Sequence, residues 1–206
     1  MSLKIFQLFG QISIFPSSTA ASIFHIVLIL WILSEIVGGI IIPNIRRGGT
    51  TVHRKDRGSG LFLFAMLFIS IAIAYYFAGA NIAMLPSWVF YPGIILMILG
   101  IIFRQWSIAV LGRFFSATVG TQEGQKVVNR GPYRFIRHPS YTGVLLTLIG
   151  LGLALQSGGA VIALILLFCL AYGYRIHTEE KVLISELGEE YIVYKKKTKR
   201  LIPYIV

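Results

Sequence analysis

The sequence predicts an all-α integral membrane protein that forms one domain over residues 1–206 and has about five transmembrane helices. Hydrophobic residues make up 56% of the chain and charged residues 13%, about half the charged share that is usual in soluble domains. The mean hydropathy is +0.77. Five apolar runs alternate with polar segments, and the basic residues are confined almost entirely to three of those segments. The length fits a single compact domain.

The N-terminal half, 1–104, is predicted to contain three spans. Its apolar runs lie at 20–42, 61–80 and 88–104, and all three fit the range of about 17–25 residues that crosses the hydrocarbon. Glu35 lies towards the end of the first run. An acid there indicates either a functional intramembrane group or a position at the interface.

The C-terminal half, 105–206, contains two shorter runs at 141–156 and 159–175, which we expect to form a tight helical hairpin. Gln156 and the three small residues after it provide the turn. A short hairpin beside polar residues predicts that those residues lie partly within the depth of the bilayer. A single cysteine excludes a fold that disulfides hold together.

The distribution of positive charge predicts the orientation of the chain. Of the 19 basic residues, 18 lie in 43–60, in 104–140 or after 174, and five spans bring these segments to one side of the membrane. The positive-inside rule makes that side cytoplasmic and puts the N-terminus outside, in a plasma membrane or endoplasmic reticulum. The net charge of +11 is then explained by anionic headgroups, notably at Lys195–Arg200, without any nucleic acid.

The segment between the third and fourth spans carries candidate binding residues. QKVVN at 125–129 contains a Val pair that could lie extended against a flat apolar group such as an adenine ring. His138 precedes Pro139, so it should mark the start of the fourth helix. A helix N-terminus with Arg134 and Arg137 beside it suits a carboxylate or another anion. The alternative is that these basic residues only anchor the helix at the headgroups.

A second polar cluster follows the fifth span. Arg175 and Glu179 are four residues apart and share one helical face. Because the last two spans form a hairpin, this pair should lie at the level of His138. A cation and an anion together suit a zwitterion, with Glu179 for its ammonium and Arg175 for its carboxylate. A further cytoplasmic helix over 181–194, interrupted by Gly188, should pack against this site and complete its pocket.

These motifs resemble the isoprenylcysteine carboxyl methyltransferase family, which is related to the phospholipid N-methyltransferases. The resemblance covers about 105–206. It consists of QKVVNRGPYRFIRHPSY at 125–141, a short hairpin, R-x-x-x-E-E from Arg175, L-x-x-x-L-G-E-E-Y-x-x-Y from Leu183, and R-L-I-P from Arg200. The family usually has Phe where this chain has Leu187. The stretch 113–124 does not match well enough to transfer any residue.

The resemblance implies that S-adenosyl-L-methionine binds on the cytoplasmic side, with no metal ion. Arg175 is implied to bind the carboxylate of a lipidated substrate, which is a prenylated small molecule or a protein C-terminus such as prenylcysteine. The implied cofactor-binding residues are Gln125, Lys126, Val127, Val128, Tyr133, His138, Pro139, Ser140, Tyr141 and Glu179.

Methyl transfer to a carboxylate agrees with this residue set. A carboxylate is already ionised at neutral pH, so it needs no general base, and positioning supplies most of the rate. A phospholipid or other amine acceptor would instead have to lose a proton, and Glu180 is the evident base for that. An NADPH-dependent membrane sterol-type reductase and a non-catalytic lipid-binding protein are the remaining alternatives.

Overall fold

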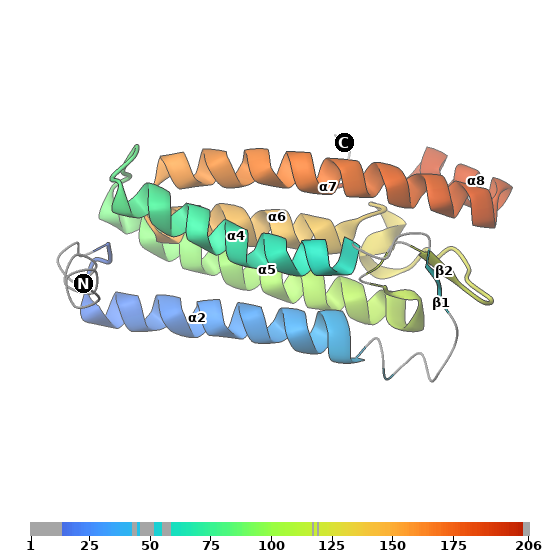
Figure 1. Ribbon diagram of the computed structural model, residues 1–206, viewed down its shortest axis with the longest axis horizontal. Helices are drawn as coiled ribbons and strands as arrows, with labels where there is room; N and C mark the ends of the chain where they lie inside the picture. Colours follow the sequence, from blue (N-terminus) through green and yellow to red (C-terminus); the bar gives the residue numbers. More distant parts are fainter. Residues whose placement is uncertain are drawn as a thin grey trace.

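The computed structural model of the protein describes residues 14–42, 45, 52–54, 59–116, 118 and 120–203. Long helices lie side by side along the long axis of the molecule, and successive helices run in opposite directions (Figure 1). They are α2 (Ser18–Ile36), α4 (Ser59–Gly79), α5 (Phe90–Leu111), α6 (Pro139–Ala154) and α7 (Gly158–Leu187). Short elements gather at one end of this bundle, which we call the polar end.

Four helical segments within the described residues are long and apolar enough to cross a membrane. They are Ser18–Ile41, Phe62–Gly79, Ser87–Phe114 and Gly158–Leu187. The helix α6 is apolar but shorter, at 16 residues. The prediction of a helical multi-pass membrane protein is therefore confirmed. The predicted apolar runs all become helices, although α6 falls short of the usual spanning length.

The predicted short hairpin is correct for α6 and wrong for α7, which runs for 30 residues from Gly158 to Leu187. We expected the helix to end with the apolar run near 175. Nothing between Arg175 and Leu187 breaks a helix, because this stretch contains no Gly or Pro. The helix ends only at Gly188, which adopts a φ of +54°, a conformation that glycine tolerates better than other residues.

The predicted separate helix over 181–194 is therefore divided between two elements. Its first part is the last turns of α7, and its second part is α8 (Glu189–Lys197). The change of direction at Gly188 brings α8 to the polar end of the bundle (Figure 1). Two buried tyrosines of α8, Tyr191 and Tyr194, face inwards.

The two helices α5 and α6 approach each other closely because glycines line their contact. A Cβ atom on Gly93 would lie 2.3 Å from the backbone N of Ala154, and one on Gly150 would lie 2.6 Å from the backbone N of Met97. Gly100 and Gly143 make the same kind of contact nearer the polar end. Small residues let membrane helices pack backbone to backbone, so this pair forms a fixed wall along one side of the site.

A small antiparallel sheet at the polar end was not predicted and is a departure from an all-α fold. In it β1 (Val52–Arg54) pairs with β2 (Gly120–Gln122), with His53 opposite Thr121. It joins the connection after α2 to the connection after α5, across 66 residues of sequence from Arg54 to Gly120. The sheet fixes the loop that precedes the candidate binding segment 125–129.

Candidate active site

Two cavities adjoin at the polar end of the bundle, and they share Phe115, Ser116 and Tyr141. We call them the polar cavity and the apolar cavity. The polar cavity encloses about 840 Å³ and the apolar cavity about 730 Å³, both counted with their open mouths.

The polar cavity collects nearly all of the residues that the sequence indicated for cofactor binding. It is bordered by the loop after α5, the start of α6, the end of α7 and α8. Its lining includes Gln125, Lys126, Val127, Val128, Tyr133, His138, Ser140, Tyr141 and Glu179. Pro139 does not line it, because this buried residue forms the first turn of α6. Arg175 lines the apolar cavity instead.

Tyr141 connects the two cavities through its hydroxyl. The hydroxyl donates a hydrogen bond to Oε2 of Glu179 at 2.8 Å and accepts one from Nε of Arg175 at 2.7 Å. Its ring stacks on that of His138 with a centroid distance of 5.5 Å and an interplanar angle of 9°. Thus Arg175 and Glu179, which we expected to act side by side, face different cavities and meet through Tyr141.

The start of α6 is as predicted, with His138 immediately before Pro139. Its surroundings differ from the expected anion site in one respect. Arg137 donates from Nε to Oε1 of Glu180 at 2.9 Å, and Nε2 of His138 lies 3.4 Å from the same oxygen. Arg134 is exposed and borders neither cavity. Two of the three side chains that we expected to bind an anion, Arg137 and His138, therefore already contact Glu180.

Buried tyrosines form the floor of the polar cavity below these charges. Tyr194 donates a hydrogen bond from its hydroxyl to the carbonyl oxygen of Tyr133 at 2.7 Å, which ties α8 to the short helix η4 (Gly131–Arg134). Burial raises the pKa of Tyr133 and of Tyr194 above the ordinary value of a tyrosine. Both hydroxyls therefore stay protonated at neutral pH and act as neutral hydrogen-bonding groups.

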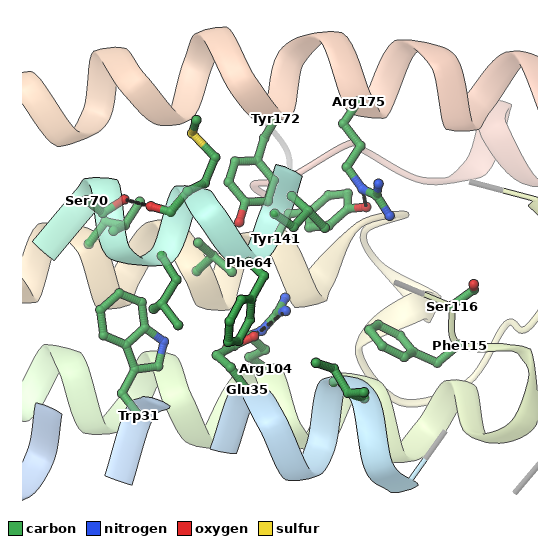
Figure 2. Close-up of a pocket in the computed structure, with 17 residues that line it drawn as sticks. Trp31, Glu35, Phe64, Ser70, Arg104, Phe115, Ser116, Tyr141, Tyr172 and Arg175 are labelled. Atoms are coloured by element: carbon green, nitrogen blue, oxygen red, sulfur yellow. Dashed lines mark hydrogen bonds and ion pairs between the residues drawn. The ribbon is translucent and has the colours of Figure 1, made fainter. Parts of the chain in front are cut away.

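The apolar cavity lies among α2, α4, α5, α6 and α7. Glu35 and Arg104 lie between Trp31 on one side and Phe115 on the other (Figure 2). Arg104 of α5 donates from Nε and Nη2 to the two carboxylate oxygens of Glu35 of α2, at 2.6 and 2.7 Å. Its Nη1 donates to the carbonyl oxygen of Ser140 at 3.3 Å. Arg175 lies on the facing side, beside Tyr141 (Figure 2). The rest of the lining is mostly Leu, Ile, Val, Met and aromatic side chains.

Sequence reasoning missed the pair of Glu35 and Arg104 as a unit. Glu35 was recognisable as an acid in an apolar run, and Arg104 was recognisable as a base at the end of another. Their separation of 69 residues left no local signal that they meet. Phe115 and Ser116, which line both cavities, were also missed because 113–124 carries no motif.

Chemically, this arrangement places two cavities of different lining next to each other at Tyr141. The polar cavity offers a carboxylate, neutral hydroxyls, the basic residues Lys126, Arg137 and His138, and the apolar surface of Val127 and Val128. The apolar cavity offers a mostly hydrophobic lining together with the guanidinium groups of Arg104 and Arg175. It therefore suits an amphiphile whose anionic head lies towards Tyr141 and whose chain lies among the helices.

Comparison with known proteins points to one family. Residues 93–185 match the model of the isoprenylcysteine carboxyl methyltransferase (ICMT) family. A probable protein-S-isoprenylcysteine O-methyltransferase from Oryza sativa subsp. indica is 29% identical over 117 residues, which are 56% of this chain and 61% of the rice protein. The protein-S-isoprenylcysteine O-methyltransferase of Saccharomyces cerevisiae is 36% identical over 115 residues, which are 55% of this chain and 48% of the yeast protein.

The fold gives the same result over most of the chain. A solved structure of a eukaryotic intramembrane Ras methyltransferase, an isoprenylcysteine carboxyl methyltransferase, superposes with a TM-score of 0.67 at 25% identity. The match covers 94% of this chain and 70% of that one. The chain spans about three fifths of the length of the rice relative. The resemblance to this family that the sequence predicted is thus confirmed by the family model, the curated relatives and the fold.

Proposed function

We propose that this protein transfers a methyl group from S-adenosyl-L-methionine to the carboxylate of a lipidated substrate, such as a C-terminal prenylcysteine, at the cytoplasmic face of a membrane. The observation that carries the proposal is the meeting of the two cavities at Tyr141. A soluble cofactor and a lipid require different surroundings, and each cavity suits one of them. The likeness to protein-S-isoprenylcysteine O-methyltransferases supports the same reaction.

The polar cavity fits the cofactor by the chemistry of its lining. S-Adenosyl-L-methionine carries an adenine ring, an ammonium, a carboxylate and a sulfonium. Val127, Val128 and Leu183 offer apolar surface for the ring, and Glu179 offers a carboxylate for a positive group. Lys126 and His138 are the basic side chains that would face the cofactor carboxylate. When bound, the cofactor supplies an electrophilic methyl group on a sulfonium.

Arg175 is the group that we propose binds the acceptor carboxylate. It is buried, lines the apolar cavity and is oriented by the 2.7 Å hydrogen bond that it donates to Tyr141. Arginine suits this role because its planar guanidinium binds a carboxylate through two parallel hydrogen bonds. The acceptor carboxylate would then lie near Tyr141, which also borders the cofactor cavity.

The residues of this chain would accelerate transfer mainly by positioning. Transfer of the methyl group would form an oxygen–carbon bond to the carboxylate, break the carbon–sulfur bond and release the neutral thioether S-adenosylhomocysteine. Two opposite charges would thereby disappear, so a site with little water favours the reaction. The apolar cavity excludes water from the lipid side, and the buried guanidinium of Arg175 holds the carboxylate in one orientation. No residue needs to remove a proton, because the acceptor is already ionised.

The amine acceptor is disfavoured by the surroundings of Glu180. Methyl transfer to an amine needs a carboxylate that is available as a base. Glu180 is instead 3% exposed and contacts Arg137, His138, Lys195 and Arg200. Such a neutralised carboxylate is a poor base, so transfer to a carboxylate remains the better reading.

We further propose that α2, α4, α5, α6 and α7 make five crossings, with the polar end in the cytoplasm and the substrate chain remaining in lipid. The helix α8 would complete the cofactor site, since Tyr191 and Tyr194 line the polar cavity. A short α6 fits this arrangement because its first turn forms the wall shared by both sites.

Calorimetric binding to the detergent-purified protein tests the reaction class. We expect S-adenosylhomocysteine, the demethylated product of the cofactor, to bind with micromolar affinity and NADPH to give no heat of binding. Binding of NADPH alone would overturn the proposal and support a reductase. If neither compound binds to folded protein, the polar cavity is not a nucleotide-type cofactor site.

A further inference from the structure

A basic groove lies at the polar end next to the polar cavity, with which it shares Arg137. It is lined by Thr198 and by the cationic residues Arg137, Lys195, Lys196, Lys197, Lys199 and Arg200. All of these except Arg137 come from the end of α8 and the chain after it. Such a concentration of like charge costs free energy through mutual repulsion unless an anion is nearby.

Arg137 holds the backbone of this groove in place through hydrogen bonds. Its Nη1 donates to the carbonyl oxygen of Lys195 at 3.1 Å and also to that of Thr198. These are carbonyls at the C-terminus of α8, which lack helical partners. Backbone hydrogen bonds also hold the chain here, from N of Arg137 to O of Lys199 at 2.7 Å and from N of His138 to O of Arg200 at 3.0 Å. The groove is thus a fixed feature and not a loose tail.

The positive charge of the groove is only partly compensated. Glu180 contacts Lys195 at 3.1 Å and Arg200 at 3.5 Å as well as Arg137 at 2.9 Å. One carboxylate is therefore shared by three cations. Lys196, Lys197 and Lys199 are exposed and point a further three positive charges to the surface. Within the described residues, this leaves the groove with an excess of positive charge that an external anion would relieve.

The position of the groove indicates the source of that anion. Thr142, in the first turn of α6, donates from its hydroxyl to the carbonyl oxygen of Leu201 at 2.6 Å. The chain therefore passes directly from the groove to the end of an apolar helix. Leu201 packs against the hydrophobic core, and the side chain of Ile202 is exposed. Basic residues followed by apolar ones beside a membrane helix fit the boundary between headgroups and hydrocarbon.

We propose that this groove binds the phosphate headgroup of an anionic phospholipid, at a site that adjoins the polar cavity at Arg137. The exposed lysines contact the phosphate, and the apolar residues after Arg200 contact the acyl region. Glu180 keeps Arg137, Lys195 and Arg200 in place between the groove and His138 of the polar cavity. The site is therefore a structural lipid site that braces one wall of the cofactor cavity.

Titration of the full chain in a neutral detergent tests this proposal. The probe is water-soluble dioctanoyl phosphatidylglycerol, and the comparison ligands are dioctanoyl phosphatidylcholine and inorganic phosphate. We expect phosphatidylglycerol to bind at least tenfold more tightly than either. The triple variant K196Q/K197Q/K199Q should weaken that binding by roughly tenfold or more, because each lysine near an anionic headgroup contributes to affinity. The variant K196R/K197R/K199R should retain it.

A matched control separates a site from general charge. The variant R130Q/R134Q/K181Q removes three exposed positive charges from the same end of the molecule but outside the groove, and it should bind phosphatidylglycerol within twofold of the unaltered protein. Circular dichroism and thermal unfolding verify that both triple variants are folded. Equal losses in the two variants would overturn the proposal. So would equal binding of phosphatidylcholine, of inorganic phosphate or of a short single-stranded RNA.

Discussion

At the scale of single residues, Tyr141 decides how the two cavities communicate. Its hydroxyl can donate one hydrogen bond. It donates that bond to Glu179 and accepts another hydrogen bond from Arg175. Stacking on His138 holds the ring at the junction. A change at this side chain therefore alters both cavities together, whereas changes at Arg175 or Glu179 should affect one cavity more than the other.

Replacing Arg175 and Glu179 separately should split acceptor chemistry from cofactor binding. Arg175→Ala should lower kcat/KM at least 100-fold, because the acceptor carboxylate loses its charged partner, while the Kd of S-adenosylhomocysteine changes less than threefold. Glu179→Ala should raise that Kd by about tenfold or more, since hydrogen bonds to charged groups contribute about 1.5–3 kcal/mol. Calorimetry and a methyl-transfer assay measure the two effects.

Two further variants, Arg175→Lys and Tyr141→Phe, complete this comparison. Arg175→Lys retains the charge but loses the planar guanidinium, so it should recover only part of the activity. Tyr141→Phe removes both hydrogen bonds and should affect the Kd and kcat together. If Arg175→Ala and Glu179→Ala turn over at the normal rate, the assignment of this site is wrong.

Motifs of adjacent residues were predictable at this scale, and contacts between distant residues were not. The sequence indicated Gln125–Val128, His138 and Glu179 because each belongs to a compact pattern, and the structure brings them to the polar cavity. It did not identify the bidentate pair of Glu35 and Arg104, or the four basic partners of Glu180, since each depends on how separate helices pack. The sequence also placed Arg134 in the site, whereas its side chain lies on the surface.

At the scale of elements, the apolar runs located every long helix but not every helix end. Hydropathy marks only the apolar part of a helix. The apolar run therefore ends at Arg175, although α7 continues for several further turns. The physical end of that helix is Gly188, where φ is positive. The small sheet of β1 and β2 was equally invisible, because three-residue strands that pair over a long sequence distance leave no periodic pattern.

The contact between α5 and α6 gives a prediction of stability. Gly150→Ala should destabilise the protein by about 1–2 kcal/mol, because the added methyl group would lie 2.6 Å from the backbone N of Met97 and 2.7 Å from the carbonyl oxygen of Gly93. The backbone of α5 cannot move aside as a flexible side chain would. Thermal unfolding of the purified protein in detergent measures the loss.

Gly173→Ala is the matched control for this prediction. Gly173 also lies inside a helix, but apart from the backbone of that helix no atom of the described residues lies within 4 Å of its added Cβ. Alanine is favoured over glycine in helices by up to about 1 kcal/mol, so this variant should be as stable as the unaltered protein or slightly more stable. Equal destabilisation by both substitutions would mean that close packing of α5 on α6 is not the cause.

At the scale of the whole molecule, the distribution of positive charge agrees with the arrangement of the helices. The five antiparallel helices bring α8, the sheet and the loop before α6 to one end (Figure 1). Among the residues that the structure describes, the basic ones belong to segments that converge there. The opposite end carries the uncharged connection from Ala80 to Ser87 and the tight turn between α6 and α7. Separation of charge between the two ends is what the positive-inside rule requires of a multi-pass protein.

This separation predicts the sidedness of the protein in a cell membrane. In a Cys169→Ala background, Ser87→Cys places an exposed thiol at the uncharged end, and Glu189→Cys places one at the start of α8. When the protein is produced in the plasma membrane of a bacterial host, a membrane-impermeant maleimide should label Ser87→Cys in intact cells. Glu189→Cys should react only after permeabilisation, because basic segments remain in the cytoplasm. The reverse pattern would put the cofactor cavity on the outer side, where no cytoplasmic cofactor reaches it, and would contradict the proposed reaction.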